Sequence, residues 1–329
     1  MPERRVRGLA MKLLIASVWV ALAGSALPAL AQYPTRPVRL IVPFAPGGGT
    51  DIVARVVAQK AGELTRQSII VDNRGGAGGL IGTELAVRAT ADGYTLGVVT
   101  ASLPISAAAS RLPFDPVHDL TLISMIGETG YFLTLHPSVP ARTAKELIAH
   151  AKANPGKVTY GSSGTGGAAH LSGELFDLLA GTKMIHVPYK STGPALNDLL
   201  AGQIQMIYGS GPVIVPHMNS GRLRVIAVTT EKRSRALPNV PTVAESGVPG
   251  YEAITWFGLM GPKGLPKDMV ARWQAILAEA LQSREMKDRF DADGLELPAI
   301  GTAYFSKVLK RDIDKWTKVV KAANIRLTN

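Results

Sequence analysis

The chain contains no cysteine among its 329 residues. It therefore has no disulfide framework, no thiolate nucleophile and no thiolate metal site. The motifs of several large enzyme classes are missing as well, because the sequence has no G-x-S-x-G elbow, Walker A loop, H-E-x-x-H motif or EF-hand loop. We accordingly expect a protein without catalytic residues, without a metal and without a cofactor.

Aromatic residues are also scarce, at 6% of the chain, although the net charge is +11. Basic residues are scattered, and those within 231–235 and 310–321 alternate with acidic residues or follow helical spacing. No row of aromatic residues accompanies them for base stacking. We interpret these charges as a solvated surface and expect no nucleic-acid partner.

The N-terminal segment is typical of an export signal. A basic region over residues 4–12 precedes an apolar run from Leu13 to Gly24, and "ALA" at 29–31 fits a small-x-small cleavage site. A membrane anchor is the alternative, because residues 13–31 could nearly span a bilayer. Pro28 and the cleavage-like end favour a signal that is cleaved after Ala31. The signal carries +3 of the +11 net charge, so the mature part carries +8.

Apolar β-branched segments alternate with helix-period segments through most of the mature chain, a pattern typical of α/β proteins with mostly parallel sheets. In the first block, we expect strands at 38–44, 68–72 and 94–100, a helix at 50–64, and a Gly-rich loop leading into a helix within 73–89. The pattern restarts at Leu120, and we expect strands at 122–126, 131–135, 158–161, 185–189, 204–208 and 223–229, with helices at 144–153, 170–180 and 195–201. The helix at 144–153 opens on the capping box Thr143–Glu146.

Two lobes follow from this pattern, since the mature chain exceeds what one compact core usually holds. After the strand-like stretch 253–261 come only helices, at 267–282 and 303–323, and they need the first block's sheet to cover. The chain would then cross between the lobes near 127–132 and near 253–258. We predict lobe 1 at 32–129 plus 256–329 and lobe 2 at 130–255, joined as a hinged clamp with its ligand in the cleft.

The Gly-rich loop "PFAPGGGTD" precedes the helix expected at 50–64. Its glycines would leave backbone N–H groups bare at a helix N-terminus, where an anion is attracted, or would serve only a tight turn. Asp51 in the first helical turn would satisfy the same dipole. We expect this carboxylate to tie the loop together, to order water or to meet an ammonium group.

A second Gly-rich loop lies in "YGSSGTGGAAHLSGEL" and contains G-x-G-x-x-A at Gly164, Gly166 and Ala169. This pattern suggests a dinucleotide site, but the next strand ends in "HVPYK" without an acidic residue for a ribose. We favour a carboxylate socket in which hydroxyl groups flank bare N–H groups. A Ser163–His170 pair in a secreted serine hydrolase is an open alternative, because catalytic groups meet in space and not in sequence.

Five segments together resemble one known family, the Bug-type substrate-binding receptors of tripartite tricarboxylate transporters. They are "YPTRPVRLIVPFAPGGGTDIVAR", "VDNRGGAGGLIGTELAVRATADGYTL", "YGSSGTGGAAHLSGELF", "HVPYKSTGPALNDLLAGQI" and "SGRLRVIAVTTEKRSRALPNVPTVAESGVPGYEAITWFGLMGPKGLP". The resemblance covers essentially the whole mature chain in order. It implies a monomeric periplasmic binding protein with a type II-like two-lobed fold and a double hinge crossover, which closes around a small organic anion and delivers it to two membrane subunits.

The resemblance also implies ligand-binding residues. In the first loop these are Phe44, Ala45, Pro46, Gly47, Gly48, Gly49, Thr50 and Asp51, and in the second loop Ser162, Ser163, Gly164, Thr165, Gly166 and Gly167. Further candidates at strand ends or near a crossover are Thr100, Ser102, His170, Tyr189, Lys190, Gly209, Ser210 and Trp256. Lys190 would either pair with a second carboxylate or remain solvated.

The ligand class stays open between a di- or tricarboxylate, an aromatic acid and an acidic amino acid. Pro46 and Gln205 depart from the family's pattern, so the acid bound by any one relative does not transfer to this chain. A ligand sensor that docks on a signalling partner is a further alternative to transport.

Overall fold

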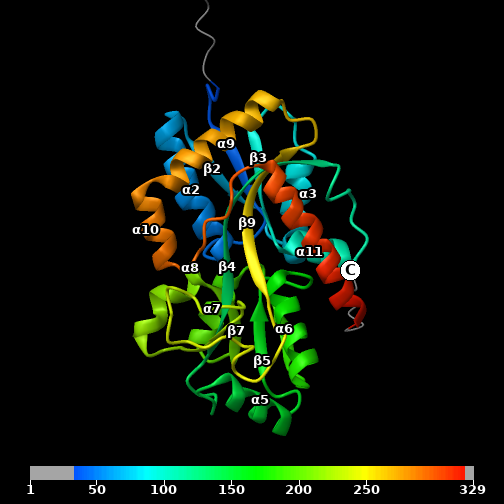
Figure 1. Cartoon of the computed structure of the whole chain (residues 1–329), viewed down its shortest axis with the longest axis vertical. Helices are drawn as coiled ribbons and strands as arrows, with labels where there is room; N and C mark the ends of the chain where they lie inside the picture. The colour runs from blue at the N-terminus through cyan, green and yellow to red at the C-terminus, as the bar shows by residue number, and fades with distance from the viewer. Residues whose placement is uncertain (1–32, 323–329) are drawn as a thin grey trace, which may run out of the picture. The chain divides into compact units, whose positions relative to one another are not determined.

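The computed structural model describes residues 33–322, and the expected export signal lies outside the described residues. From Arg36 onward the chain forms one compact unit. Its elements are a mixed sheet and the helices that flank it (Figure 1). The fold class predicted from the alternation of strands and helices is confirmed.

The first part of the sheet has a parallel core. β1 (Val38–Val42) pairs in parallel with β2 (Ile69–Asn73) on one side and with β3 (Thr95–Thr100) on the other. The helices that follow these strands are α2 (Gly49–Thr65), α3 (Leu80–Val87) and α4 (Ser102–Ala109). The helix α4 was not expected, because "SLPISAAA" contains a proline. Pro104 lies in its first turn, where a missing N–H removes no helical hydrogen bond.

The second part of the sheet repeats this plan. β5 (Thr159–Ser162) pairs in parallel with β6 (Ile185–Pro188) and with β7 (Met206–Ser210), and β8 (Arg224–Val228) runs antiparallel to β4. The helices here are α5 (Ala144–Ala153), α6 (Ala168–Ala180), α7 (Thr192–Leu200) and α8 (Gly211–Ile214). The capping box at the start of α5 is confirmed, since Thr143 Oγ1 accepts the Glu146 N–H at 3.1 Å.

Two long antiparallel strands connect these parts. β4 (Leu120–Leu135) pairs with β9 (Ile254–Pro262) as far as Gly130 and with β7 from Tyr131 onward, and Figure 1 shows both strands running from the upper into the lower half. The prediction of two separate strands at 122–126 and 131–135 is wrong. The intervening "GET" stays in the sheet because its backbone pairs with β9 across two irregularities in register.

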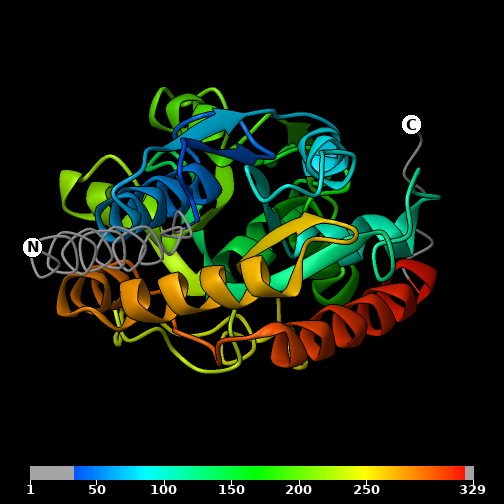
Figure 2. The same ribbon diagram turned by 90° about the horizontal axis from the view of Figure 1, so that it is seen from above.

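Helices at the C-terminal end of the described chain cover the first part of the sheet. α9 (Lys267–Gln282) packs on α2 and β4, and α11 (Thr302–Ala322) packs on α4 and β4 (Figure 2). The apolar stripe expected to be core is buried throughout and comprises Phe305, Val308, Leu309, Trp316 and Val320. A further helix, α10 (Arg284–Ala292), was not expected from the sequence.

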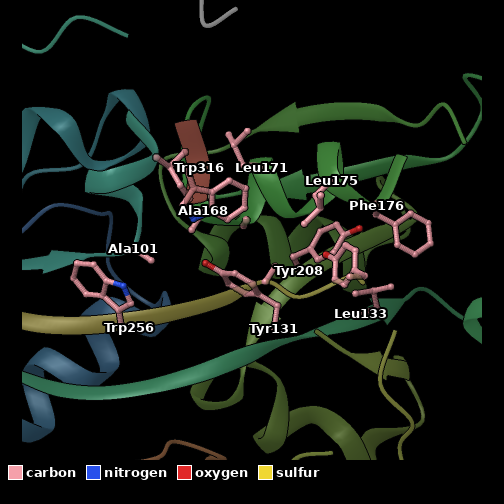
Figure 3. Close-up of a cluster of buried hydrophobic side chains, with 14 of the residues drawn as sticks. Ala101, Tyr131, Leu133, Ala168, Leu171, Leu175, Phe176, Tyr208, Trp256 and Trp316 are labelled. Atoms are coloured by element: carbon pink, nitrogen blue, oxygen red, sulfur yellow. The ribbon is translucent and has the colours of Figure 1, made fainter. Parts of the chain in front are cut away.

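The largest buried cluster extends through both parts of the sheet. Figure 3 shows Trp316 of α11 beside Ala168 and Leu171 of α6, and all three belong to this cluster. The helix that covers the first part therefore also reaches the first turn of α6 in the second part. Among residues 33–322, no helix is both long enough and apolar enough to cross a membrane.

Candidate functional site

A small cavity lies where the carboxyl ends of strands from both parts of the sheet meet. It has a volume of about 30 Å³. Its lining residues follow β1, β3, β5 and β6, end β3 and β7, or lie on β4 and β9. They are Phe44, Gly49, Thr50, Thr100, Ser102, Tyr131, Ser163, Ser191, Thr192, Ser210, Thr255 and Phe257. Open α/β sheets place ligands at this edge, because loops from neighbouring strands converge there.

The lining is polar without being charged. Its members are mostly serine and threonine, with two phenylalanines and one tyrosine, and none of the described residues that line it is charged. Tyr131 is buried and its hydroxyl hydrogen-bonds Thr255. Burial raises the pKa of Tyr131 well above its usual range, so its hydroxyl stays protonated and neutral.

Helix N-termini also point their first residues at this cavity. α2, α4 and α7 contribute lining residues from their first turns, namely Thr50, Ser102 and Thr192. The first amide of α6 reaches the same wall, since Ala168 N donates to Ser102 Oγ at 3.1 Å. The partial positive charge at each helix start favours an anion here.

Asp51 holds the first loop together. Its carboxylate accepts the Gly47 N–H at 3.0 Å, Arg55 Nε at 3.0 Å and Asn73 Nδ2 at 2.9 Å, and Asn73 Nδ2 also donates to the Phe44 carbonyl. Burial would raise the pKa of Asp51, but the bonds from Arg55, Gly47 and Asn73 outweigh it and lower the pKa. The carboxylate is not among the lining groups of the cavity.

The first loop contacts the second part of the sheet closely enough to require glycine. A Cβ on Gly48 would lie 1.9 Å from Ser191 Oγ, and a Cβ on Gly49 would lie 2.1 Å from Ser210 Oγ. The backbones are also joined, because Ala45 N donates to the Lys190 carbonyl at 3.0 Å. Pro46 and Gly47 are exposed on the outer side of the loop.

The second loop, residues 162–167, presents Ser163 to the cavity and turns Ser162 inward. Ser162 is fully buried, and its Oγ lies 2.6 Å from His186 Nε2. Gly166 has a φ of +78°, which favours glycine, and its N–H donates to His170 Nδ1 at 3.1 Å. His170 thus lies behind the loop and does not line the cavity.

Other residues predicted for the site lie nearby with their side chains engaged elsewhere. Tyr189 donates its hydroxyl to Asp198 Oδ2 at 2.6 Å, and burial and that carboxylate raise the pKa of Tyr189 to about 12. Lys190 is exposed and meets the first loop through its carbonyl oxygen. Gly209 is buried within β7, away from the cavity lining.

Trp256 faces away from the cavity. Its indole Nε1 donates to Asp312 Oδ2 of α11 at 2.7 Å, and Figure 3 shows the ring beside Ala101. Successive residues of a strand point to opposite faces, so the neighbours Thr255 and Phe257 line the cavity instead. The sequence predicts an aromatic residue near the crossover, but it does not predict which face of β9 that residue occupies.

Five lining residues were not anticipated from the sequence: Tyr131, Ser191, Thr192, Thr255 and Phe257. Ser191 and Thr192 follow the strand expected at 185–189 and open α7, where Ser191 Oγ accepts the Gly193 N–H. The N-cap preference for serine would have found them. Period-two alternation along β9 predicts that Thr255 and Phe257 share a face, but it does not predict that this face lines a cavity.

The comparisons with known proteins agree on one family. The family model described as "Tripartite tricarboxylate transporter family receptor" matches residues 53–325. The chain belongs to this receptor family. The receptor is 38% identical to Protein BugT of Bordetella pertussis over 320 residues, which cover 96% of this chain and 98% of BugT.

Solved structures resemble the receptor over nearly its whole length. Periplasmic binding protein BugD is 31% identical with a TM-score of 0.85, over 89% of this chain and 99% of that one. A protein from R. palustris determined with adipate is 34% identical with a TM-score of 0.83, over 89% and 99%. MatC from Rhodopseudomonas palustris with bound malate is 28% identical with a TM-score of 0.84, over 88% and 100%. The predicted periplasmic binding protein fold and receptor class are confirmed.

Proposed function

We propose that the cavity between the Gly-rich loops binds a small organic acid through its carboxylate. The observation that carries this proposal is the convergence of helix N-termini and hydroxyl groups on a cavity whose described lining has no charged residue. A carboxylate accepts several hydrogen bonds at once, and N–H and O–H donors at helix starts match it. Adipate and malate, which accompany two of the relatives, make dicarboxylates the first ligands to test.

Binding requires the loops to part and close again. A cavity of about 30 Å³ holds roughly two water molecules, at about 10–15 Å³ for each, so a four- or six-carbon acid needs more room. Bonds from Ala45 N to Lys190 and from Ala168 N to Ser102 would then belong to the closed state. A ligand shifts the open–closed equilibrium by binding the closed state better.

The lobes that close are the two predicted from the sequence, residues 32–129 plus 256–329 and residues 130–255. Support for this division comes from β4, whose partner changes from β9 to β7 between Gly130 and Tyr131. A second crossing lies at the start of β9. A hinge at two neighbouring strands lets each part move as a rigid body.

The receptor acts by binding and not by catalysis. The Ser163–His170 pair of a serine hydrolase finds little support, because His170 is occupied by the Gly166 N–H and faces Glu174 at 3.5 Å. Ester turnover that disappears in Ser163→Ala would favour the hydrolase. We further propose that the exported receptor, cleaved after Ala31, works as a monomer that delivers its acid to two membrane subunits. Ligand-dependent capture of a signalling protein instead would favour the sensor.

A ligand screen on protein stripped of bound acid tests the proposal. Adipate, malate, aromatic acids and acidic amino acids are compared by native mass spectrometry and thermal shift, with adipamide as an uncharged control of matched length. An acid at 100 times its Kd stabilises the fold by about 2.7 kcal/mol and raises Tm by roughly 5 °C. Binding of adipamide as tight as that of adipate, or no binding by any acid, would contradict the proposal.

A further inference from the structure

Two histidine rings lie stacked directly behind the second Gly-rich loop. His170 belongs to the first turn of α6 and His186 to β6, and their ring centroids are 3.8 Å apart with planes that differ by 21°. His170 is buried and His186 is partly buried. Neither ring lines the cavity, so carboxylate binding does not explain why they are there.

His170 holds the loop as a hydrogen-bond acceptor. Its Nδ1 receives the Gly166 N–H at 3.1 Å, so this nitrogen carries a lone pair and the ring's proton lies on Nε2. Nε2 faces Glu174 Oε1 at 3.5 Å. A second proton could enter only at Nδ1, where it would point at the Gly166 N–H. His170 therefore cannot be an imidazolium and hold the loop at the same time.

His186 holds the other end of the loop. Its Nε2 lies 2.6 Å from Ser162 Oγ, and the same oxygen accepts the Gly164 N–H at 3.1 Å. Burial, followed by the neighbouring ring of His170, lowers the pKa of His186 to about 3. A neutral His186 thus provides a fixed surface on which His170 stacks.

We propose that His170 and His186 are positioning residues that hold the 162–167 loop, and that proton uptake by His170 releases the loop and weakens ligand binding. Only the last step rests on the proposed function, because loop release can be observed without a ligand. The device responds to acidification, because a proton on Nδ1 turns this nitrogen from a hydrogen-bond acceptor into a donor.

The groups that face His170 have opposite effects on its protonated form. Glu174 on α6 stabilises an imidazolium through Nε2, and its own position is fixed by Tyr160 of β5, whose hydroxyl donates to Glu174 Oε1 at 2.8 Å. The ring of His186 and the N–H of Gly166 oppose the imidazolium. Protonation of His170 therefore gains the contact with Glu174 but has to break the bond to Gly166.

Nuclear magnetic resonance on the ligand-free, ¹⁵N-labelled protein tests loop release. We expect His170 Nδ1 to be unprotonated and hydrogen-bonded at pH 8, and the Gly166 amide to shift with the same midpoint as the His170 ring on acidification. His170→Asn keeps an acceptor near the Nδ1 position and should hold the Gly166 amide constant with pH. His170→Gln moves the amide group to the Nε2 position and should lose the Gly166 bond at every pH. A chemical shift of the Gly166 amide that stays constant while His170 takes up its proton would overturn the proposal.

The effect on binding is measured with adipate and malate between pH 8 and pH 5. The ratio of wild-type to His170→Asn affinity cancels the titration of the acid itself. Loss of one backbone hydrogen bond of about 1 kcal/mol should lower this ratio about five-fold toward pH 5. His118→Asn, which removes an exposed ring paired with Asp115, should keep the wild-type profile. A constant ratio in a folded protein would refute the link to binding. If neither acid binds, the nuclear magnetic resonance titration of the Gly166 amide alone tests loop release.

Discussion

Substitution of Gly48 by alanine should weaken ligand binding without unfolding the receptor. Gly48 has φ −86° and ψ 168°, which alanine adopts without strain, so the effect comes only from the added methyl group. That methyl carbon would lie 1.9 Å from Ser191 Oγ and 3.3 Å from Thr192 Oγ1. The overlap exists only while the first loop contacts the start of α7, so the open form accepts the methyl group and the closed form does not.

The expected loss of affinity follows from the hydrogen bond that Ser191 would lose. Its Oγ has to leave its place, which removes the N-cap bond to the Gly193 N–H, worth about 0.5–2 kcal/mol. Residual crowding in a packed interface adds to this, and overpacking typically costs about 1–3 kcal/mol. A closed state destabilised by about 1–3 kcal/mol lowers affinity roughly 5- to 150-fold.

A double-mutant cycle with Ser191→Ala identifies the clash as the cause. Without Ser191 Oγ, the nearest atoms to the new methyl group are about 3.3 Å away, so Gly48→Ala should cost less than about 1 kcal/mol in that background. Affinities of the four proteins are measured by isothermal titration calorimetry with the best acid from the screen, and circular dichroism verifies folding. Near-wild-type affinity of Gly48→Ala, or an equal loss in both backgrounds, would refute the closure geometry.

Three further substitutions distinguish residues that stabilise the fold from residues that bind the ligand. The wild-type protein should lose stability as pH falls from 6.5 to 3, because His186 takes up a proton in the unfolded chain near pH 6.5 but in the folded protein only near pH 3. His186→Gln should reduce this loss. At 1.36 kcal/mol per pKa unit, and discounted for partial exposure, this amounts to roughly 3 kcal/mol in urea unfolding at pH 3, and identical pH profiles would contradict it. Asp51→Asn should cost about 1–3 kcal/mol at pH 7 by weakening the Arg55 contact. Because the pKa of Asp51 is lowered from 3.8, the difference from wild type should begin to shrink as pH falls below 3.8 and should disappear only at the lower pH where the folded carboxylate gains its proton. Trp256→Phe leaves Asp312 without its indole donor and should lower Tm while ligand affinity stays unchanged; weaker binding at equal stability would instead place Trp256 in the site.

The parts of the fold that follow local periodicity could be predicted from the sequence. The bounds of α9 at Lys267–Gln282 were predicted correctly, and those of α2 and α11 to within one residue, because each has a continuous apolar face. The single strand β4 could not be predicted, since "GET" signals a break and only the pairing with β9 keeps it extended. Long-range pairing overrides local propensity there.

The site residues could likewise be predicted where local sequence marks them, but not where long-range strand pairing brings them to the cavity. Loops after strands, such as Phe44 to Asp51, are visible as glycine-rich stretches, and Thr50 and Ser163 from these loops do line the cavity. Tyr131 and Phe257 lie inside strands and carry no local signal of a site. They line the cavity only because β4 and β9 pass beneath the loops, which is a property of the topology.

The position of Asp51 shows how one loop can serve both the fold and an anion. A carboxylate in the first turn of α2 would normally take up the positive end of the helix and repel an anionic ligand. Here its oxygens are turned to Gly47, Arg55 and Asn73, and the Arg55 guanidinium offsets its charge. The loop is thereby tied from outside, while Gly49 and Thr50 remain on the cavity wall. A carboxylate that binds there meets backbone and hydroxyl donors, while the negative charge of Asp51 is already paired with Arg55.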